Sequence, residues 1–147
     1  MQILVDADAC PHQIQKTITS IARDHALQCL FVSSYAHFSY QDFQKDYLYV
    51  DKSSQAVDLV IVNRVQVDDI VVTQDYGLAA LVLAKGGKAI STRGMVYSKE
   101  NIEQLLEQRH ITSKIRKGGG RILGPTKITQ QDVERFRQNF SRLIRSI

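Results

Sequence analysis

The sequence has little cysteine, no long apolar run and no leader-like start, and each absence narrows what the chain can be. Its two cysteines, Cys10 and Cys29, are too few for a disulfide framework or a four-cysteine zinc site. No stretch approaches the ~20 apolar residues that span a bilayer. Residues 1–5 enter a strand pattern directly, without the basic and apolar segments of a secretion signal. We therefore expect a cytoplasmic protein in a reducing setting, with no membrane partner.

What remains is an ordinary globular composition with an uneven charge. The 147 residues are 44% hydrophobic and 23% charged, which suits one domain over residues 1–147. Residues 1–108 carry 9 Lys and Arg against 13 Asp and Glu, a net charge of −4, and residues 109–147 carry 10 against 2, a net charge of +8. The basic C-terminal part, residues 112–147, suits a polyanion such as RNA beside an acidic metal site. A basic helical tail without a nucleic-acid partner fits these charges equally well.

Acidic residues follow two apolar strand patterns. Residues 3–5 are apolar and are followed by Asp6 and Asp8, and residues 70–72 are β-branched and are followed by Asp75. A helical pattern begins after each of these segments. Because open α/β sheets bind ligands at the carboxyl ends of their strands, both junctions predict carboxylates on one rim of a sheet.

Strand and helix patterns alternate, which predicts an α/β fold with a mostly parallel five-stranded sheet between helices. We expect strands over residues 3–5, 27–32, 47–50, 70–72 and 88–91. We expect helices over residues 11–25, 53–65, 98–109, from Thr129 onward, and between Asp75 and Gly86, with loops over residues 35–46 and 116–121. The segment 53–65 is assigned to helix because parallel strands need a crossover of about a dozen residues. A strand order of 3-2-1-4-5 places Asp6 and Asp75 on either side of the switch point.

Asp58 is a third candidate, because it lies inside an apolar helical run and a buried carboxylate needs a partner. Asp6, Asp58 and Asp75 together suit a hard cation such as Mg²⁺ or Mn²⁺, which activates water for attack on phosphorus. Asp8 would support these ligands or align the water. Plainer interpretations stay open: Asp6, Asp8 and Asp75 as helix caps, and Asp58 as an exposed residue. Asp68 and Asp69 are expected to form a solvated turn.

Several motifs occur in order along nearly the whole chain. They are Asp-Ala-Asp-Ala-Cys-Pro at 6–11, Ala-Val-Asp at 56–58, Asp-Ile-Val-Val-Thr-Gln-Asp at 69–75 with Leu78 and Ala79, Arg93-Gly94, Gly124-Pro125 and Phe136. This series resembles the YaiI/YqxD family of uncharacterised bacterial proteins. That family is grouped with PIN-like domains, a fold of metal-dependent ribonucleases with acidic residues at strand ends.

The resemblance implies a three-layer PIN-like domain in which Asp6, Asp58 and Asp75 match the acidic positions of the PIN pattern. It further implies a divalent-metal-dependent ribonuclease that uses Mg²⁺ or Mn²⁺. The usual fourth acid, after the fifth strand, is missing, because Ser-Thr-Arg-Gly stands at residues 91–94. Either Asp8 replaces that acid, or the activity is weaker or different.

Basic residues supply the candidate phosphate and RNA contacts. Arg93 follows the fifth predicted strand, where it can meet a phosphate or pair with Asp75 or Asp58. Arg116, Lys117 and Arg121 surround a run of glycines and can contact an RNA backbone; the other interpretation is a mobile surface loop.

Two alternatives to a nuclease remain, and both use the same residues. One is a haloacid-dehalogenase-like phosphatase, with Asp6 as nucleophile and Asp8 as acid or base. The other is a protein that binds RNA without cutting it. Cys10 precedes a helix start, where its thiol pKa can fall, but a packed small side chain is the simpler interpretation. The sequence leaves the oligomeric state open and allows a homodimer.

Overall fold

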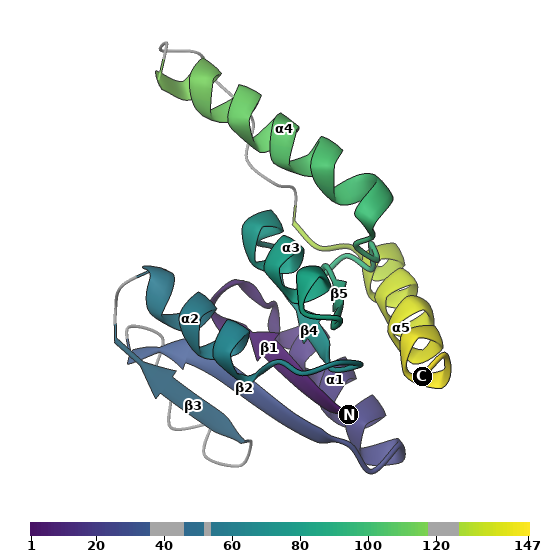
Figure 1. Ribbon diagram of the computed structural model, residues 1–147. Helices are drawn as coiled ribbons and strands as arrows, with labels where there is room; N and C mark the ends of the chain where they lie inside the picture. Colours follow the sequence, from purple (N-terminus) through teal and green to yellow (C-terminus); the bar gives the residue numbers. More distant parts are fainter. Residues whose placement is uncertain (36–45, 52–53, 118–126) are drawn as a thin grey trace.

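The central sheet has five strands in the order β3-β2-β1-β4-β5, and every neighbouring pair is parallel. This computed structural model describes residues 1–35, 46–51, 54–117 and 127–147, with the backbone alone at residues 54, 109 and 111–117. The strands are β1 (Gln2–Asp6), β2 (Gln28–Ser34), β3 (Tyr47–Val50), β4 (Ile70–Val72) and β5 (Lys88–Ile90). The predicted fold class and strand order are confirmed, with β1 in the middle of the sheet (Figure 1).

Helices connect these strands and begin at the positions that the sequence favours. They are α1 (His12–Asp24), α2 (Ser54–Arg64), α3 (Tyr76–Ala84), α4 (Lys99–Lys117) and α5 (Gln130–Arg145), with a 3-10 turn, η1 (Ala7–Ala9), after β1. Pro11 precedes α1, Asp75 caps α3, and a capping box of Thr129 and Asp132 begins α5. The predicted helix over residues 53–65 is confirmed as α2.

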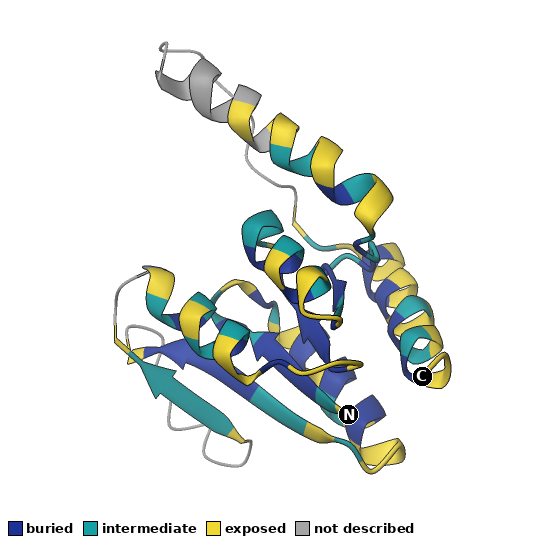
Figure 2. Cartoon of the chain, viewed as in Figure 1, coloured by how far each residue is buried: buried dark blue, intermediate teal, exposed yellow. Residues whose placement is uncertain are grey.

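The sheet is covered on both faces, which gives the three layers that the alternating pattern predicts. Successive residues of a strand point to opposite faces, so Ile3 and Val5 pack with α1 and α5 while Leu4 packs with α2, α3 and the start of α4. All three side chains are fully buried. Figure 2 shows β4 buried along its whole length and β1 buried in its middle, whereas the helices expose their outer sides.

Helix α4 is longer than predicted. It continues to Lys117, whereas the sequence pattern placed its end near residue 109 and a loop at 116–121. The chain has no glycine or proline between Lys99 and Gly118, so no residue that breaks a helix interrupts it. The rest of the predicted basic loop and most of the predicted loop over residues 35–46 lie outside the described residues.

Asp69 corrects a second prediction. It is only 4% exposed, and its carboxylate accepts hydrogen bonds from the backbone N–H groups of Gln2, at 3.0 Å, and Gln66, at 2.8 Å. The prediction of a solvated turn is therefore wrong for Asp69, which anchors the start of β1 beside β4. Asp68 is exposed, with a φ of 68°, as expected of a turn residue. None of the described helices combines the length and apolar character needed to cross a membrane.

Candidate active site at the carboxyl edge of the sheet

Asp6 lies at the carboxyl end of the central strand, beside the end of β4. Val5 is paired with Val72, so the residues that follow, Asp6 and Thr73, emerge next to each other. The Thr73 hydroxyl donates to Oδ2 of Asp6 at 2.9 Å, and Thr73 is completely buried. This contact holds the Asp6 carboxylate at the point where the strand order reverses.

The electrostatic setting of Asp6 brings the predicted acids together. The pKa of Asp6 is raised from its ordinary 3.8 to about 6, chiefly by burial and against the lowering effect of the Thr73 hydrogen bond. The negative charges of Asp58, Asp8 and Asp75 are smaller contributions to the same rise. Three segments that are distant in sequence therefore carry carboxylates whose charges act on Asp6.

Asp75 is the N-cap of α3 and is also tied to Asp6. Its Oδ1 accepts from the backbone N–H of Leu78 at 3.1 Å, while its own N–H donates to the Thr73 hydroxyl oxygen at 3.0 Å. Thr73 thus connects Asp6 to Asp75 through a single hydroxyl. The capping and functional interpretations of Asp75 are compatible, because the cap uses one carboxylate oxygen and fixes the direction of the other.

Tyr97 supports this corner and was not identified from the sequence. Its side chain is 2% exposed, and its hydroxyl donates to the Thr73 carbonyl at 3.1 Å. Burial raises the pKa of the Tyr97 hydroxyl, as do Tyr76 and Asp75 nearby. No local signal marks Tyr97, since its partner is 24 residues earlier in the chain.

Asp8 is fastened to the end of β2. Its Oδ1 accepts from the Ser33 hydroxyl at 2.7 Å and from the Ser34 backbone N–H at 3.0 Å. These bonds join η1 to the neighbouring strand and fix the orientation of the Asp8 carboxylate. Nothing local in the sequence shows that the two serines contact Asp8.

Asp58 reaches the group from α2. It is half-buried in that helix. Of the three carboxylates whose charges raise the pKa of Asp6, Asp58 has the largest effect. Its neighbour Val57 is buried in the core layer beneath α2, which fixes the helix face from which Asp58 projects.

Arg93 pairs with Asp132, a partner that the sequence patterns did not assign to it. Its Nη1 lies 2.8 Å from Oδ2 of Asp132, in the first turn of α5, and Arg135 contacts the same carboxylate at 3.2 Å. Arg93 thus joins the segment after β5 to α5. Arg116 and Lys117 lie in the last turn of α4, whose side chains are not described there, and Arg121 lies outside the described residues.

The four aspartates do not form a ready-made metal cage. Within the described part of the chain, no three His, Cys, Asp or Glu side chains are grouped closely enough to hold a metal ion. Mg²⁺ typically takes only one or two carboxylates directly and keeps several waters. Asp6, Asp58 and Asp75 are therefore the residues that could hold such an ion partly through water. The mutual repulsion at Asp6 is the feature that a cation would relieve.

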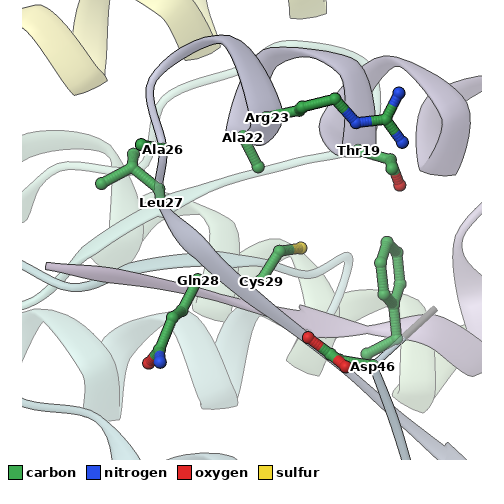
Figure 3. A pocket seen from close by; sticks show the side chains of 9 residues that line it. Thr19, Ala22, Arg23, Ala26, Leu27, Gln28, Cys29 and Asp46 are labelled. Carbon is green, nitrogen blue, oxygen red and sulfur yellow. The ribbon is translucent and has the colours of Figure 1, made fainter.

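A cavity of about 350 Å³ lies away from these carboxylates, between the end of α1 and the first residues of β2 (Figure 3). Arg23, Cys29 and Asp46 line it, at the amino end of β2, whereas Asp8 contacts the carboxyl end of that strand. Cys29 is therefore only partly buried, and it packs against the core cluster that contains Phe31. Cys10 is buried in the core, which agrees with a packed side chain.

Comparisons with known proteins agree with the resemblance seen in the motifs. Residues 4–146 match the family described as "Uncharacterized BCR, YaiI/YqxD family". A UPF0178 protein of Staphylococcus saprophyticus is 43% identical over 145 residues, covering 97% of this chain and 93% of that protein. A UPF0178 protein of Enterococcus faecalis is 41% identical over 147 residues, covering 99% and 98%. No solved structure gives a significant match.

Proposed function

The chain belongs to the YaiI/YqxD family, and from this premise we propose that it is a divalent-metal-dependent hydrolase of RNA phosphodiester bonds. The observation that carries the proposal is the position of Asp6 at the switch point of a parallel sheet, where Thr73 joins it to Asp75. The charges of Asp58, Asp8 and Asp75 act on it there and contribute to its raised pKa. Perturbed carboxylates at such an edge are typical of catalytic sites. The PIN-like resemblance of the motifs supports the fold, and the carboxylates at the sheet edge support the activity.

The residues of the site have distinct tasks in this proposal. Asp6, Asp58 and Asp75 would hold Mg²⁺ or Mn²⁺, directly or through water. A bound ion of this kind neutralises charge on the phosphate and lowers the pKa of a water molecule. Thr73 and the α3 cap keep Asp6 and Asp75 in place, so little reorganisation is needed when substrate arrives.

Asp8 is better suited to positioning than to proton transfer. Two donors already bind its Oδ1, which fixes the orientation of this carboxylate at the end of β2. This orientation favours a hydrolytic site in which Asp8 orients water. It gives less support to a phosphatase in which Asp6 forms a covalent phosphate.

RNA is the proposed substrate because of charge. The net charge of +8 over residues 109–147 provides attraction for a polyanion, and Arg116, Lys117 and Arg121 are the proposed phosphate contacts. Arg93 is proposed as a further phosphate contact, and its bond to Asp132 orients the guanidinium.

Replacing Asp75 by Asn tests this function sharply, because Asn keeps the helix cap and removes the charge. We expect the wild-type protein with Mn²⁺ to cleave a panel of labelled RNAs, and Asp75→Asn to lose cleavage at least a hundredfold while binding RNA nearly as well. Glu103→Gln, an exposed change on α4, is the matched control and should cleave normally.

The same samples separate the alternatives. Phosphate trapped covalently on Asp6, found by mass spectrometry after incubation with a phosphomonoester, would favour the phosphatase. Salt-sensitive RNA binding with no cleavage in any metal would favour a binding protein. Wild-type protein that neither gains thermal stability with Mn²⁺ nor degrades RNA would refute the proposal.

A further inference from the structure

Four aromatic rings are stacked along the β2–β3 side of the sheet. Phe31 and Tyr47 lie 5.1 Å apart between ring centroids, Tyr47 and Tyr49 lie 5.5 Å apart, and Tyr49 and Tyr35 lie 5.9 Å apart. The angles between successive ring planes are 13°, 19° and 22°. Such offset, nearly parallel stacking is a favoured arrangement of aromatic side chains, and here it forms a continuous column across two strands.

The column runs from the core to solvent. Phe31 is 2% exposed, Tyr47 and Tyr49 are half-buried, and Tyr35 is 58% exposed. The Tyr47 hydroxyl donates to Oε1 of Gln15 in α1 at 2.6 Å, which anchors the middle of the column. Among the large hydrophobic side chains that the described residues expose, Tyr35 alone is aromatic. Its ring is therefore both accessible and held in one orientation by the ring beneath it.

Tyr35 also stands beside the carboxylate site. The residue before it, Ser34, donates its backbone N–H to Oδ1 of Asp8 at 3.0 Å, and the charge of Asp8 acts on Asp6. The exposed end of the column thus lies at the carboxyl edge of the sheet, on the same rim as the candidate active site. A nucleotide whose phosphate occupied that site would carry a base within reach of this edge.

We propose that Tyr35, held flat on Tyr49, is a stacking site for an unpaired nucleobase and that the substrate is single-stranded RNA. The identity of the ligand as RNA rests on the proposed function. Every base offers a π-face, so stacking on a tyrosine is tolerant of sequence, and bases inside a duplex cannot reach such a ring. The site therefore selects unpaired strands and leaves their sequence largely unread.

The test measures binding without catalysis. A fluorescently labelled single-stranded oligoribonucleotide is titrated with the Asp75→Asn protein in the absence of metal, and affinity is read by anisotropy. Added to that background, Tyr35→Leu should weaken binding roughly tenfold, and Tyr35→Phe should bind like the parent because it keeps the ring. Val67→Ala, which alters another exposed apolar side chain, is the control and should change nothing.

An abasic strand of the same length and charge isolates the role of the base. The parent protein should bind it about as weakly as Tyr35→Leu binds the normal strand, and a duplex should bind weakly to both. Equal affinity for abasic and normal strands, equal affinity of Tyr35→Leu and the parent, or no binding of single strands by the parent would each overturn the stacking site.

A second measurement covers the case in which Tyr35→Leu does not fold. Irradiation of wild-type protein with a 4-thiouracil-containing strand should crosslink Tyr35, as identified by peptide mass spectrometry, and a crosslink that avoids residues 34–35 would contradict the proposal. Failure of this site is distinguishable from failure of the proposed function. RNA cleavage without dependence on Tyr35 overturns stacking alone, and Tyr35-dependent binding without cleavage overturns hydrolysis alone.

Discussion

Asp6 and Asp69 are shielded carboxylates at opposite ends of the β1–β4 pair. Hydrogen-bond donors surround Asp69, whereas other carboxylates surround Asp6. Asp69 accepts from the backbone N–H and the side-chain amide of Gln2, each at 3.0 Å, and from the Gln66 N–H at 2.8 Å. Asp6 accepts from Thr73 and faces three other acids. One carboxylate therefore stabilises the fold, while the other costs stability that only a cation or a proton can restore.

The first prediction concerns the pH dependence of stability. Because the folded pKa of Asp6 is raised from 3.8 to about 6, the folded state holds its proton more tightly, and stability falls as pH rises through that window. Asp6→Asn keeps an acceptor for Thr73 and removes the charge. It should raise the free energy of unfolding by about 3 kcal/mol at pH 8 and change it little near pH 4.

Denaturant unfolding at both pH values, without divalent metal, measures this difference, and Glu103→Gln serves as the exposed control. A destabilised Asp6→Asn protein at pH 8 would mean that the charge of Asp6 is compensated within the folded chain.

The second prediction concerns Asp69. Asp69→Ala leaves three donors from Gln2 and Gln66 without their acceptor, so the free energy of unfolding should fall by about 3 kcal/mol. Asp68→Asn is the neighbouring control, because Asn tolerates the positive φ of that exposed position. Thermal or denaturant unfolding that showed equal effects at the two sites would contradict the buried role of Asp69.

At this scale, the sequence identifies residues whose role follows from a local junction and misses those whose partner is distant. Asp6 directly follows one apolar strand pattern, and Asp75 follows another after two polar residues. Their position at the carboxyl edge of the sheet was therefore predictable. Asp69 stands beside Asp68 in a polar pair, and nothing local shows that Gln2 comes to it from 67 residues away. Tyr97 and Ser33 were missed for the same reason.

Among the elements, α5 is docked through the turn after β5. Asn139 donates to the Gly94 carbonyl at 2.7 Å, and Arg93 reaches Asp132 in the α5 capping box. Gly94 itself has a φ of 91°, and a Cβ there would lie 2.6 Å from the backbone nitrogen of Phe136. The Arg-Gly pair that carried the family resemblance is thus, in part, a packing device.

The third prediction follows from this contact. Gly94→Ala should lower the free energy of unfolding by more than about 3 kcal/mol, because backbone of α5 blocks the new methyl group. Gly86→Ala has a similar φ of 85°, but its Cβ would meet only the Val67 side chain at 3.2 Å, so about 1 kcal/mol is expected. Similar losses for both variants, in matched urea titrations, would show that conformational strain alone decides the cost.

Element identities were largely predictable, and element ends less so. Residues 54–64 carry strand-favouring Val and Ile yet form α2, because a parallel crossover overrides local propensity. The predicted end of α4 was wrong. The glycines at 118–120 favour a loop, but the residues between Lys99 and Lys117 contain no helix breaker, so the helix continues to Lys117.

In the whole molecule, two cores share one sheet. Phe136 and Phe140, stacked 5.1 Å apart, fill the α1 and α5 side, while Leu78 and Ile61 fill the other side. The strand order could be predicted because the connection rules for parallel strands leave few arrangements. The relation of the acids to the aromatic column could not, since it depends on how β2 and β3 register.

The fourth prediction is that both cores unfold together, as expected of one domain of this length. Phe136→Ala and Leu78→Ala should each lower the free energy of unfolding by about 3 to 4 kcal/mol in a single transition. Near-ultraviolet and far-ultraviolet circular dichroism should give coincident denaturation curves for both variants. Separate transitions in either variant would indicate two independently stable halves.

The central position of β1 has a consequence for biosynthesis. A ribosome makes this strand first, and β2 and β3 can join one side of it as they emerge, but β4 cannot join the other side until residue 72 has been made. Throughout that interval the unpaired backbone N–H and C=O groups along the open edge of β1 can pair with other chains. Translation between β3 and β4 is therefore the stage at which a chaperone would protect this polypeptide most.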